Sequence, residues 1–205
     1  ILSVGDFRDY TKSQNPDSNF GKILKINTVT KEITQVSLGH RNPQGLELSK
    51  DSNYILSSEH GPKGGDEINI ISKEAIYQNF GWPISSYGEH YQKGTYDNFP
   101  EIAPLHKSHK DYGFIEPLLY FSSATNGRHG ISDIVNDYFI EKESYFVSTQ
   151  SGKVLYRVEI NERKIVSFLT YKSSERVRDM IYDESRGVYF ILFEDSPSIG
   201  LMSEK

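Results

Sequence analysis

The chain has 205 residues, of which 36% are hydrophobic and 13% aromatic, so it is long enough to bury a sizeable core in one or two domains. Its net charge of −5, without a block of Lys and Arg, argues against a general nucleic-acid-binding surface. The absence of cysteine excludes disulfides, thiolate catalysis and cysteine-bound zinc, and no apolar run is long enough for a membrane span.

Short apolar or β-branched segments, separated by turn residues, predict β-strands along most of the chain. The segments are Ile1–Val4, Gly21–Ile26, Ile33–Leu38, Leu46–Leu48, Tyr54–Glu59, Ile68–Ile71, Leu118–Phe121, Tyr145–Thr149, Gly152–Val158, Ile165–Leu169, Met180–Tyr182 and Val188–Glu194. Helix signals are weak apart from a short turn at Ser72–Tyr77. Residues 87–111 have little periodicity and several Gly, Pro and Lys residues, so we expect a long loop or insertion there.

A repeat is visible in the order of these strands. Gly21-Lys22-Ile23-Leu24 and Gly152-Lys153-Val154-Leu155 each begin a strand, and each is followed by a polar turn, a second strand, an Arg-containing loop and two more strands. The copies start 131 positions apart. This equals three periods of roughly 44 residues, within the range of a four-stranded propeller blade, so we expect two further blades between the copies.

The predicted fold class is therefore all-β, a single β-propeller domain over residues 1–205 with four-stranded antiparallel blades. The chain accommodates about four to four and a half such blades. Closure protects the edge strands of a propeller. Because the chain also starts in strand-like sequence at Ile1, without an initiator Met, we expect it to be part of a larger ring.

The most informative motifs lie on predicted loops, where binding chemistry tends to be placed. They are His40-Arg41-Asn42-Pro43-Gln44-Gly45, Glu59-His60-Gly61-Pro62-Lys63-Gly64-Gly65-Asp66-Glu67-Ile68-Asn69 and Asn79-Phe80-Gly81-Trp82-Pro83. Taken singly, each residue has a simpler interpretation: the arginines as solvated surface, Gly61-Pro62 as a turn, Asp66-Glu67 as a solvated pair and Trp82 as blade core. The motifs indicate a binding site only when they are considered together, at this spacing.

With Arg176-Val177-Arg178-Asp179, this set resembles the soluble aldose sugar dehydrogenases of the glucose/sorbosone dehydrogenase family, which use pyrroloquinoline quinone (PQQ) and calcium on a six-bladed propeller. The resemblance covers nearly the whole chain and corresponds to the C-terminal part of the propeller. It implies that the parent protein oxidises aldose sugars to lactones, passes electrons to an acceptor and is periplasmic or secreted.

The resemblance also implies roles for individual residues. Arg41 and Asn42 would contact the quinone, and Arg41 would act catalytically by supporting the charge of the reduced cofactor. Gln14 would supply an amide contact. Arg176 and Arg178 would pair with the cofactor's carboxylates, since planar guanidinium groups bind carboxylates in bidentate fashion.

Calcium ligands follow from the same resemblance. Gly61 and Pro62 would direct backbone carbonyls at an activating calcium, and Glu67 would bind a second, structural calcium. Oxygen ligands of this kind suit a hard cation.

Three departures from the family pattern keep a second hypothesis open. The family's catalytic histidine lies in a blade that precedes Val4-Gly5-Asp6, so we expect this chain alone to lack the base. Gln150 stands where many members have a cofactor-binding lysine, and the segment Ser122–Gly130 differs from the usual sequence. The alternative function is a non-catalytic propeller that binds carbohydrate or protein on the same face.

Overall fold

The computed structural model describes residues 1–73, 78–91, 100–122 and 129–204. The strands are β1 (Leu2–Val4), β2 (Lys22–Ile26), β3 (Ile33–Leu38), β4 (Pro43–Leu48), β5 (Tyr54–Glu59), β6 (Gly65–Ser72), β7 (Gln78–Asn79), β8 (Leu119–Ser122), β9 (Ile131–Asn136), β10 (Ser144–Thr149), β11 (Val154–Asn161), β12 (Lys164–Lys172), β13 (Val177–Asp183), β14 (Val188–Phe193) and β15 (Ile199–Ser203). The helical elements are α1 (Tyr10–Gln14) and the 3-10 helix η1 (His109–Tyr112). The all-β prediction is confirmed, while the predicted turn at Ser72–Tyr77 falls largely outside the described residues.

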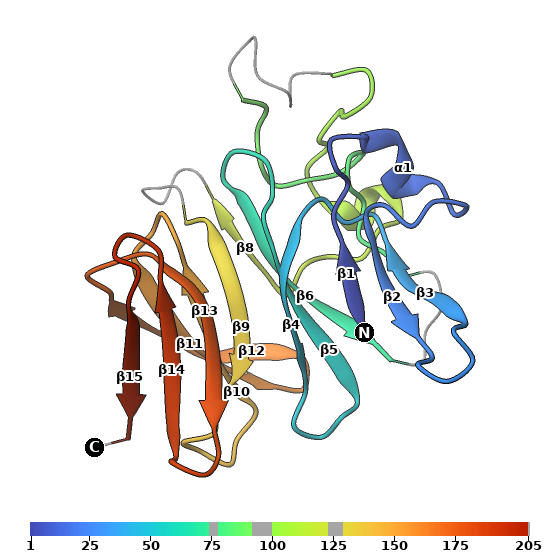
Figure 1. Ribbon diagram of the computed structural model, residues 1–205. Helices are drawn as coiled ribbons and strands as arrows, with labels where there is room; N and C mark the ends of the chain where they lie inside the picture. The colour runs from blue at the N-terminus through green and yellow to red at the C-terminus, as the bar shows by residue number, and fades with distance from the viewer. Residues whose placement is uncertain (74–77, 92–99, 123–128, 205) are drawn as a thin grey trace.

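The strands form four sheets arranged side by side in an arc (Figure 1). Their strand orders are β1-β2-β3-β7, β4-β5-β6-β8, β9-β10-β11-β12 and β13-β14-β15. The pairings are antiparallel except that β7 runs parallel to β3. The first strands of the last three sheets are β4, β9 and β13, and β9 neighbours both β4 and β13. These are the blades of a propeller, with three four-stranded sheets and one three-stranded sheet in the described part of the chain.

Each pair of neighbouring sheets encloses its own hydrophobic core. Strand β10 shows how the sequence achieves this, because all six of its residues are buried. Tyr145 and Val147 pack toward the second sheet, whereas Phe146 packs toward the fourth. Alternate side chains of a strand point to opposite faces, so a sheet covered on both sides requires a continuous apolar run.

The repeat is real, but its predicted spacing is wrong. The first copy begins at β2 in the first sheet and the second copy begins at β11 in the third, so only one complete sheet lies between them. The 131 positions therefore cover two blades instead of three. Residues 73–118, inserted between β6 and β8, account for the extra length, and the loop expected at 87–111 lies inside this segment.

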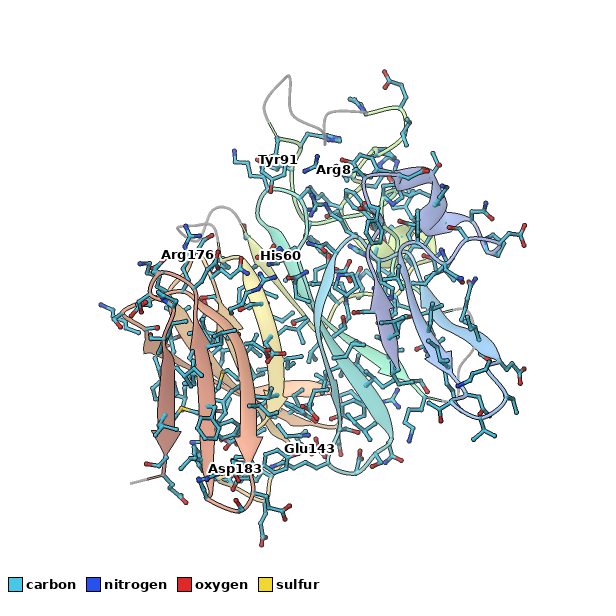
Figure 2. All side chains as sticks on the ribbon, viewed as in Figure 1. Arg8, His60, Tyr91, Glu143, Arg176 and Asp183 are labelled. Carbon is cyan, nitrogen blue, oxygen red and sulfur yellow. The ribbon has the colours of Figure 1, made fainter. Side chains whose placement is uncertain are left out.

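One end of the sheets gathers the motif loops. The loops before β4 and β13 and those after β5 and β10 all lie at this end because neighbouring strands alternate in direction. Figure 2 shows His60 and Arg176 there, with Glu143 and Asp183 at the opposite end. We call the end with His60 the upper face. In the described ranges, no helix is long and apolar enough to cross a membrane.

Candidate functional site

The loop between β3 and β4 is held in place by Glu59, the last residue of β5. One carboxylate oxygen, Oε1, accepts a hydrogen bond from the backbone N–H of Arg41 at 2.5 Å. The other, Oε2, lies 2.8 Å from Nδ1 of the buried His40, whose Nε2 lies 2.7 Å from Ser37 Oγ. Both carboxylate oxygens and both imidazole nitrogens are therefore used, which fixes the backbone direction of Arg41.

The Arg41 side chain extends from this loop across the upper face. Its Nη1 donates to the carbonyl of His60 at 3.3 Å, and its guanidinium lies 5.4 Å from the centre of the Trp82 ring. Trp82 is oriented in turn by Asp6, which accepts from its Nε1 at 2.8 Å. A stacked, half-buried guanidinium is pre-organised to bind an anionic or keto oxygen.

The side chains of Asn42 and Gln14 already form hydrogen bonds within the protein. The Asn42 side-chain oxygen accepts from Gln44 Nε2 at 3.1 Å, and its backbone carbonyl accepts from the N–H of His60 at 3.0 Å. The Gln14 amide donates to the Trp82 carbonyl at 2.6 Å and accepts from Asn79 Nδ2 at 2.7 Å. Gln14 thus orients the segment that supports Arg41. Its predicted direct contact with a cofactor stays a prediction.

Arg41, Gly61, Pro62 and Glu67 line a single small cavity on the upper face. The cavity has a volume of about 10 Å³, the space of one water molecule or ion. Gly61 is required here because a Cβ at this position would lie 1.8 Å from the carbonyl oxygen of Gly65. The structure therefore brings together the arginine and all three predicted calcium ligands.

Glu67 is buried, so its interpretation as part of a solvated pair is wrong. Burial, followed by the nearby carboxylate of Glu59, raises the pKa of Glu67 well above its usual range. Its Oε1 lies 3.5 Å from Nε2 of the buried His109, whose Nδ1 lies 2.9 Å from the Phe80 carbonyl. Two buried carboxylates beside a neutral imidazole form an environment that favours a cation.

The two arginines at β13 differ in their surroundings. Arg176 pairs with Glu194 at 3.6 Å and with Asp195 at 3.5 Å. Arg178 is exposed and forms no ion pair with a described residue, but its charge, like that of Arg41, acts on His60 to lower the pKa of that imidazole. The charges of Arg41, in the loop before β4, and of Arg178, on β13, thus both act on His60.

The comparisons with known proteins agree with this geometry. The profile of the family described as Glucose / Sorbosone dehydrogenase matches residues 1–200. The chain belongs to the glucose/sorbosone dehydrogenase family.

Among its relatives, the chain is similar to the aldose sugar dehydrogenase YliI of Escherichia coli K12, at 29% identity over 88% of this chain and 45% of YliI. It is 35% identical to quinoprotein glucose dehydrogenase B of Acinetobacter calcoaceticus, over 44% of this chain and 20% of that protein. A crystal structure of glucose dehydrogenase aligns with a TM-score of 0.78 and 26% identity, over 98% of this chain and 59% of its own. The chain thus spans less than half of YliI and well over half of the aligned crystal chain.

The upper face carries polar groups that suit a quinone cofactor. His60 Nε2 and Gln150 Nε2 are both buried and have no hydrogen-bond partner in the part of the chain that the structure describes. Burying such an atom without a partner costs free energy, and a hydrogen bond to a ligand offsets this cost. With the guanidinium groups of Arg41 and Arg178 on the same face, they suit a ligand with several carboxylate and carbonyl oxygens, and the residues fit PQQ.

The groups around Glu67 bear on whether a calcium ion fits there. Within the described ranges, no three His, Asp or Glu side chains are placed to hold a metal ion together. A calcium ion near Glu67 would therefore depend on backbone carbonyls as well. The carbonyl of Pro62 accepts from the N–H of Gly65 at 3.0 Å, and a carbonyl has a second lone pair for a cation. The buried carboxylates and the ion-sized cavity fit calcium, and the ligand assignment stays a prediction.

Sequence reasoning missed the importance of Asp66 and of the imidazole of His60. Asp66 is buried, and its two oxygens accept from the N–H groups of Gly61 and Ile131, each at 3.1 Å. It therefore joins the 59–67 loop to the start of β9. The only signal in the sequence was the position of Asp66 directly after two glycines, which does not specify a partner that is 65 residues away.

Proposed function

We propose that the protein containing this chain is a PQQ- and calcium-dependent dehydrogenase that oxidises aldose sugars to lactones. A periplasmic or secreted location and transfer of the electrons to a separate acceptor are part of the same proposal. When bound, PQQ would accept the hydride, and calcium would polarise the quinone as a Lewis acid.

One observation carries the proposal: the charges of Arg41, in the loop before β4, and of Arg178, on β13, both act on His60 at the upper face, where Arg41 also donates to the His60 carbonyl. Two guanidinium groups on the same face match a ligand with several carboxylates. Arg41, stacked on Trp82, would stabilise negative charge on the reduced ring. The family membership and the quinoprotein among the relatives support the same assignment.

The buried groups would have separate tasks around the cofactor. Glu59 and His40 keep the Arg41 backbone in place, and Gln14 holds the segment below Trp82. Beside the adjoining cavity, Gly61 and Pro62 would direct their carbonyls at an activating calcium, and Glu67 would bind a second, structural calcium. None of the described histidines is assigned the role of base, which by family resemblance belongs to a blade before Val4.

The non-catalytic alternative is favoured by the replacement of the usual lysine by Gln150 and by the altered segment Ser122–Gly130, of which residues 123–128 lie outside the described part of the chain. Against it, Gln150 presents a buried amide nitrogen without a partner among the described residues, so the position still offers a donor to a ligand.

The first test is titration of the purified chain with PQQ, with and without calcium, followed by calorimetry and absorbance. We expect calcium-dependent binding that is lost in Arg41→Ala and retained in Arg186→Ala. Arg186 is a matched control because it is an exposed arginine paired with Asp183 at the opposite end of the sheets. A folded chain that does not bind PQQ would overturn the cofactor assignment for this chain.

The second test concerns activity and uses the protein that contains this chain. We expect reduction of an artificial acceptor that requires an aldose, PQQ and calcium together, with one lactone formed per two electrons. Binding of PQQ without any aldose-dependent reduction would favour the binding propeller.

A further inference from the structure

A cluster of ion pairs joins the third and fourth sheets at the upper face. The ammonium group of Lys153 lies 2.6 Å from one carboxylate oxygen of Asp195, and Nε of Arg176 lies 3.5 Å from the other. Lys153 directly precedes β11 in the third sheet, whereas Arg176 precedes β13 and Asp195 follows β14 in the fourth. Figure 2 shows Arg176 at the same end of the sheets as His60. Two cations from neighbouring sheets therefore share one carboxylate.

The backbone is fixed on both sides of Asp195. The N–H of Glu194 donates to the carbonyl of Arg176 at 3.0 Å. On the other side, the N–H and the hydroxyl of Ser196 donate to one carboxylate oxygen of Glu175 at 2.7 and 2.6 Å. Asp195 is thus held between two anchored residues, which limits where its carboxylate can lie.

Lys153 is held by the turn between β10 and β11. Its N–H donates to the carbonyl of Gln150 at 3.2 Å, and its carbonyl accepts from the N–H of Ser173 at 2.8 Å. Its φ of +49° is left-handed, which is uncommon for a residue with a side chain. The turn is also tied to the loop before β9, because the N–H of Gly152 donates to the carbonyl of His129 at 2.9 Å. A fixed turn of the third sheet therefore carries the ammonium group that reaches the fourth.

The cluster has the composition of a carboxylate-binding site that already holds a carboxylate. The side chains of Lys153, Arg176 and Asp195 are 45%, 44% and 36% exposed. Ion pairs this exposed contribute little to stability, because water solvates the separated charges nearly as well. Asp195 can therefore turn into solvent at little cost. A ligand carboxylate placed between Lys153 and Arg176 would restore both ion pairs, and a guanidinium group can bind it in bidentate fashion.

We propose that Lys153 is a cofactor-binding residue, which together with Arg176 takes one carboxylate of PQQ in the place that Asp195 occupies in this structure. The inference rests on the proposed function. It adds a cation from the third sheet to the site and makes Asp195 an internal competitor of the cofactor.

The test measures PQQ affinity by calorimetry in the presence of calcium. Asp195→Asn removes the competing charge and keeps the size of the side chain, so we expect it to tighten binding about 3- to 10-fold. Lys153→Met removes the ammonium group and should weaken binding by about the same factor. The matched control is the ion pair of Lys142 and Glu159, at 3.3 Å, beside Glu143 at the opposite end of the sheets. Lys142→Met and Glu159→Gln should each leave the affinity within about 2-fold of wild type.

The double variant Lys153→Met/Asp195→Asn separates a direct exchange from a long-range effect of charge. If Asp195 competes for the place beside Lys153, the gain from Asp195→Asn should be at least about 2-fold smaller when Lys153 is replaced by Met. An equal gain in both backgrounds would show that Asp195 acts only through its charge, and would overturn the exchange. The melting temperatures of the single variants should stay close to that of wild type, because exposed ion pairs contribute little to stability. A change of affinity then reports on the site and not on folding.

The outcomes separate the inference from the proposed function. If wild type binds PQQ but Lys153→Met binds as tightly as Lys142→Met, or Asp195→Asn gains no affinity, the inference is overturned and the proposed function stands. If the folded wild-type chain does not bind PQQ, the proposed function fails and the inference fails with it.

Discussion

The ammonium group of Lys22 is expected to stabilise the loop that carries α1. Its side chain is fully buried. Nζ donates to the carbonyls of Lys12, Ser13 and Phe20 at 2.9, 2.9 and 2.8 Å. Three donors meet three acceptors from one loop, so the charge is solvated by the backbone. Replacement by Met keeps the length of the side chain and removes all three bonds.

The expected loss of stability is smaller than the sum of three broken bonds. The carbonyls of Lys12 and Ser13 keep a second donor each, the N–H groups of Asn15 and Gly39, both at 3.1 Å. Hydrogen bonds from charged groups contribute about 1.5–3 kcal/mol each, but removing the ammonium also removes the cost of burying it. We therefore expect Lys22→Met to lower the free energy of unfolding by about 2–4 kcal/mol.

Urea unfolding followed by circular dichroism measures this change, with the slope against urea expected to stay constant. Lys25→Met is the control, because Lys25 lies exposed on the same strand and should change the free energy of unfolding by less than about 0.5 kcal/mol. If Lys22→Met is as stable as Lys25→Met, the three carbonyl contacts contribute nothing net and the reasoning is refuted.

Three further predictions concern pH, cofactor and metal. Burial, followed by other effects that include the charge of Asp179, raises the pKa of Asp133 from 3.8 to about 7, so the folded chain binds more protons than the unfolded chain across this range. Stability to urea should accordingly fall as the pH rises from 3.8 to about 7 in wild type, and an equal fall in Asp133→Asn would contradict this. Gln150→Ala should weaken PQQ binding about 3- to 10-fold in calorimetry, because a buried donor is lost. Gln35→Ala, remote in sequence, is the control and should leave the affinity for PQQ unchanged. Equal affinities of the two variants would show that Gln150 does not belong to the site. Calcium should raise the melting temperature of wild type but not of Glu67→Gln, because the ion stabilises only a folded state that has its carboxylate ligand. The same rise in both proteins would exclude Glu67 as a ligand.

Strand positions could be predicted from the sequence wherever both faces of a strand are buried. Ile68–Ile71 and Tyr145–Thr149 lie within β6 and β10, since continuous apolar runs are the requirement for packing between two sheets. β9 was not predicted, because it contains Ser132 and Asp133 and therefore lacks the apolar run. Such polar positions are tolerated where partners from other strands satisfy them, as Ser148 and Val177 do for Ser132.

The number of blades between the two repeats could not be obtained from spacing alone. A period assumes that loops have similar lengths, and residues 73–118 break this assumption within the second sheet. Loop insertions cost little entropy, so they change the length of a repeat without changing its fold. The pairing of β6 with β8 across the insertion is a property of the folded sheet.

The motifs predicted which residues would lie near one another, but not which of their polar atoms remain without a hydrogen-bond partner. Gly61, Pro62 and Glu67 could be placed with Arg41 because Gly-Pro turns and adjacent strand ends have few conformations. The amide of Gln14 instead bonds to Trp82 and Asn79, partners more than 60 residues away that no local pattern encodes. The chemistry of a residue type can be predicted from the local sequence. Which of its hydrogen-bond donors and acceptors remain unused depends on contacts that only the fold creates.

Arg176 and Arg178 show the same distinction within one motif. They are equivalent in sequence spacing, yet Arg176 is held by Glu194 and Asp195, and Asp195 also pairs with Lys153 at 2.6 Å. Arg178 has no ion pair among the described residues, and its charge adds to the effect of burial in lowering the pKa of His60. Exposed ion pairs contribute only about 0–1 kcal/mol each, so Arg176 can exchange its partners for a carboxylate ligand at little cost. Arg178 needs no exchange, so we expect Arg178 to bind a carboxylate ligand more readily than Arg176 does.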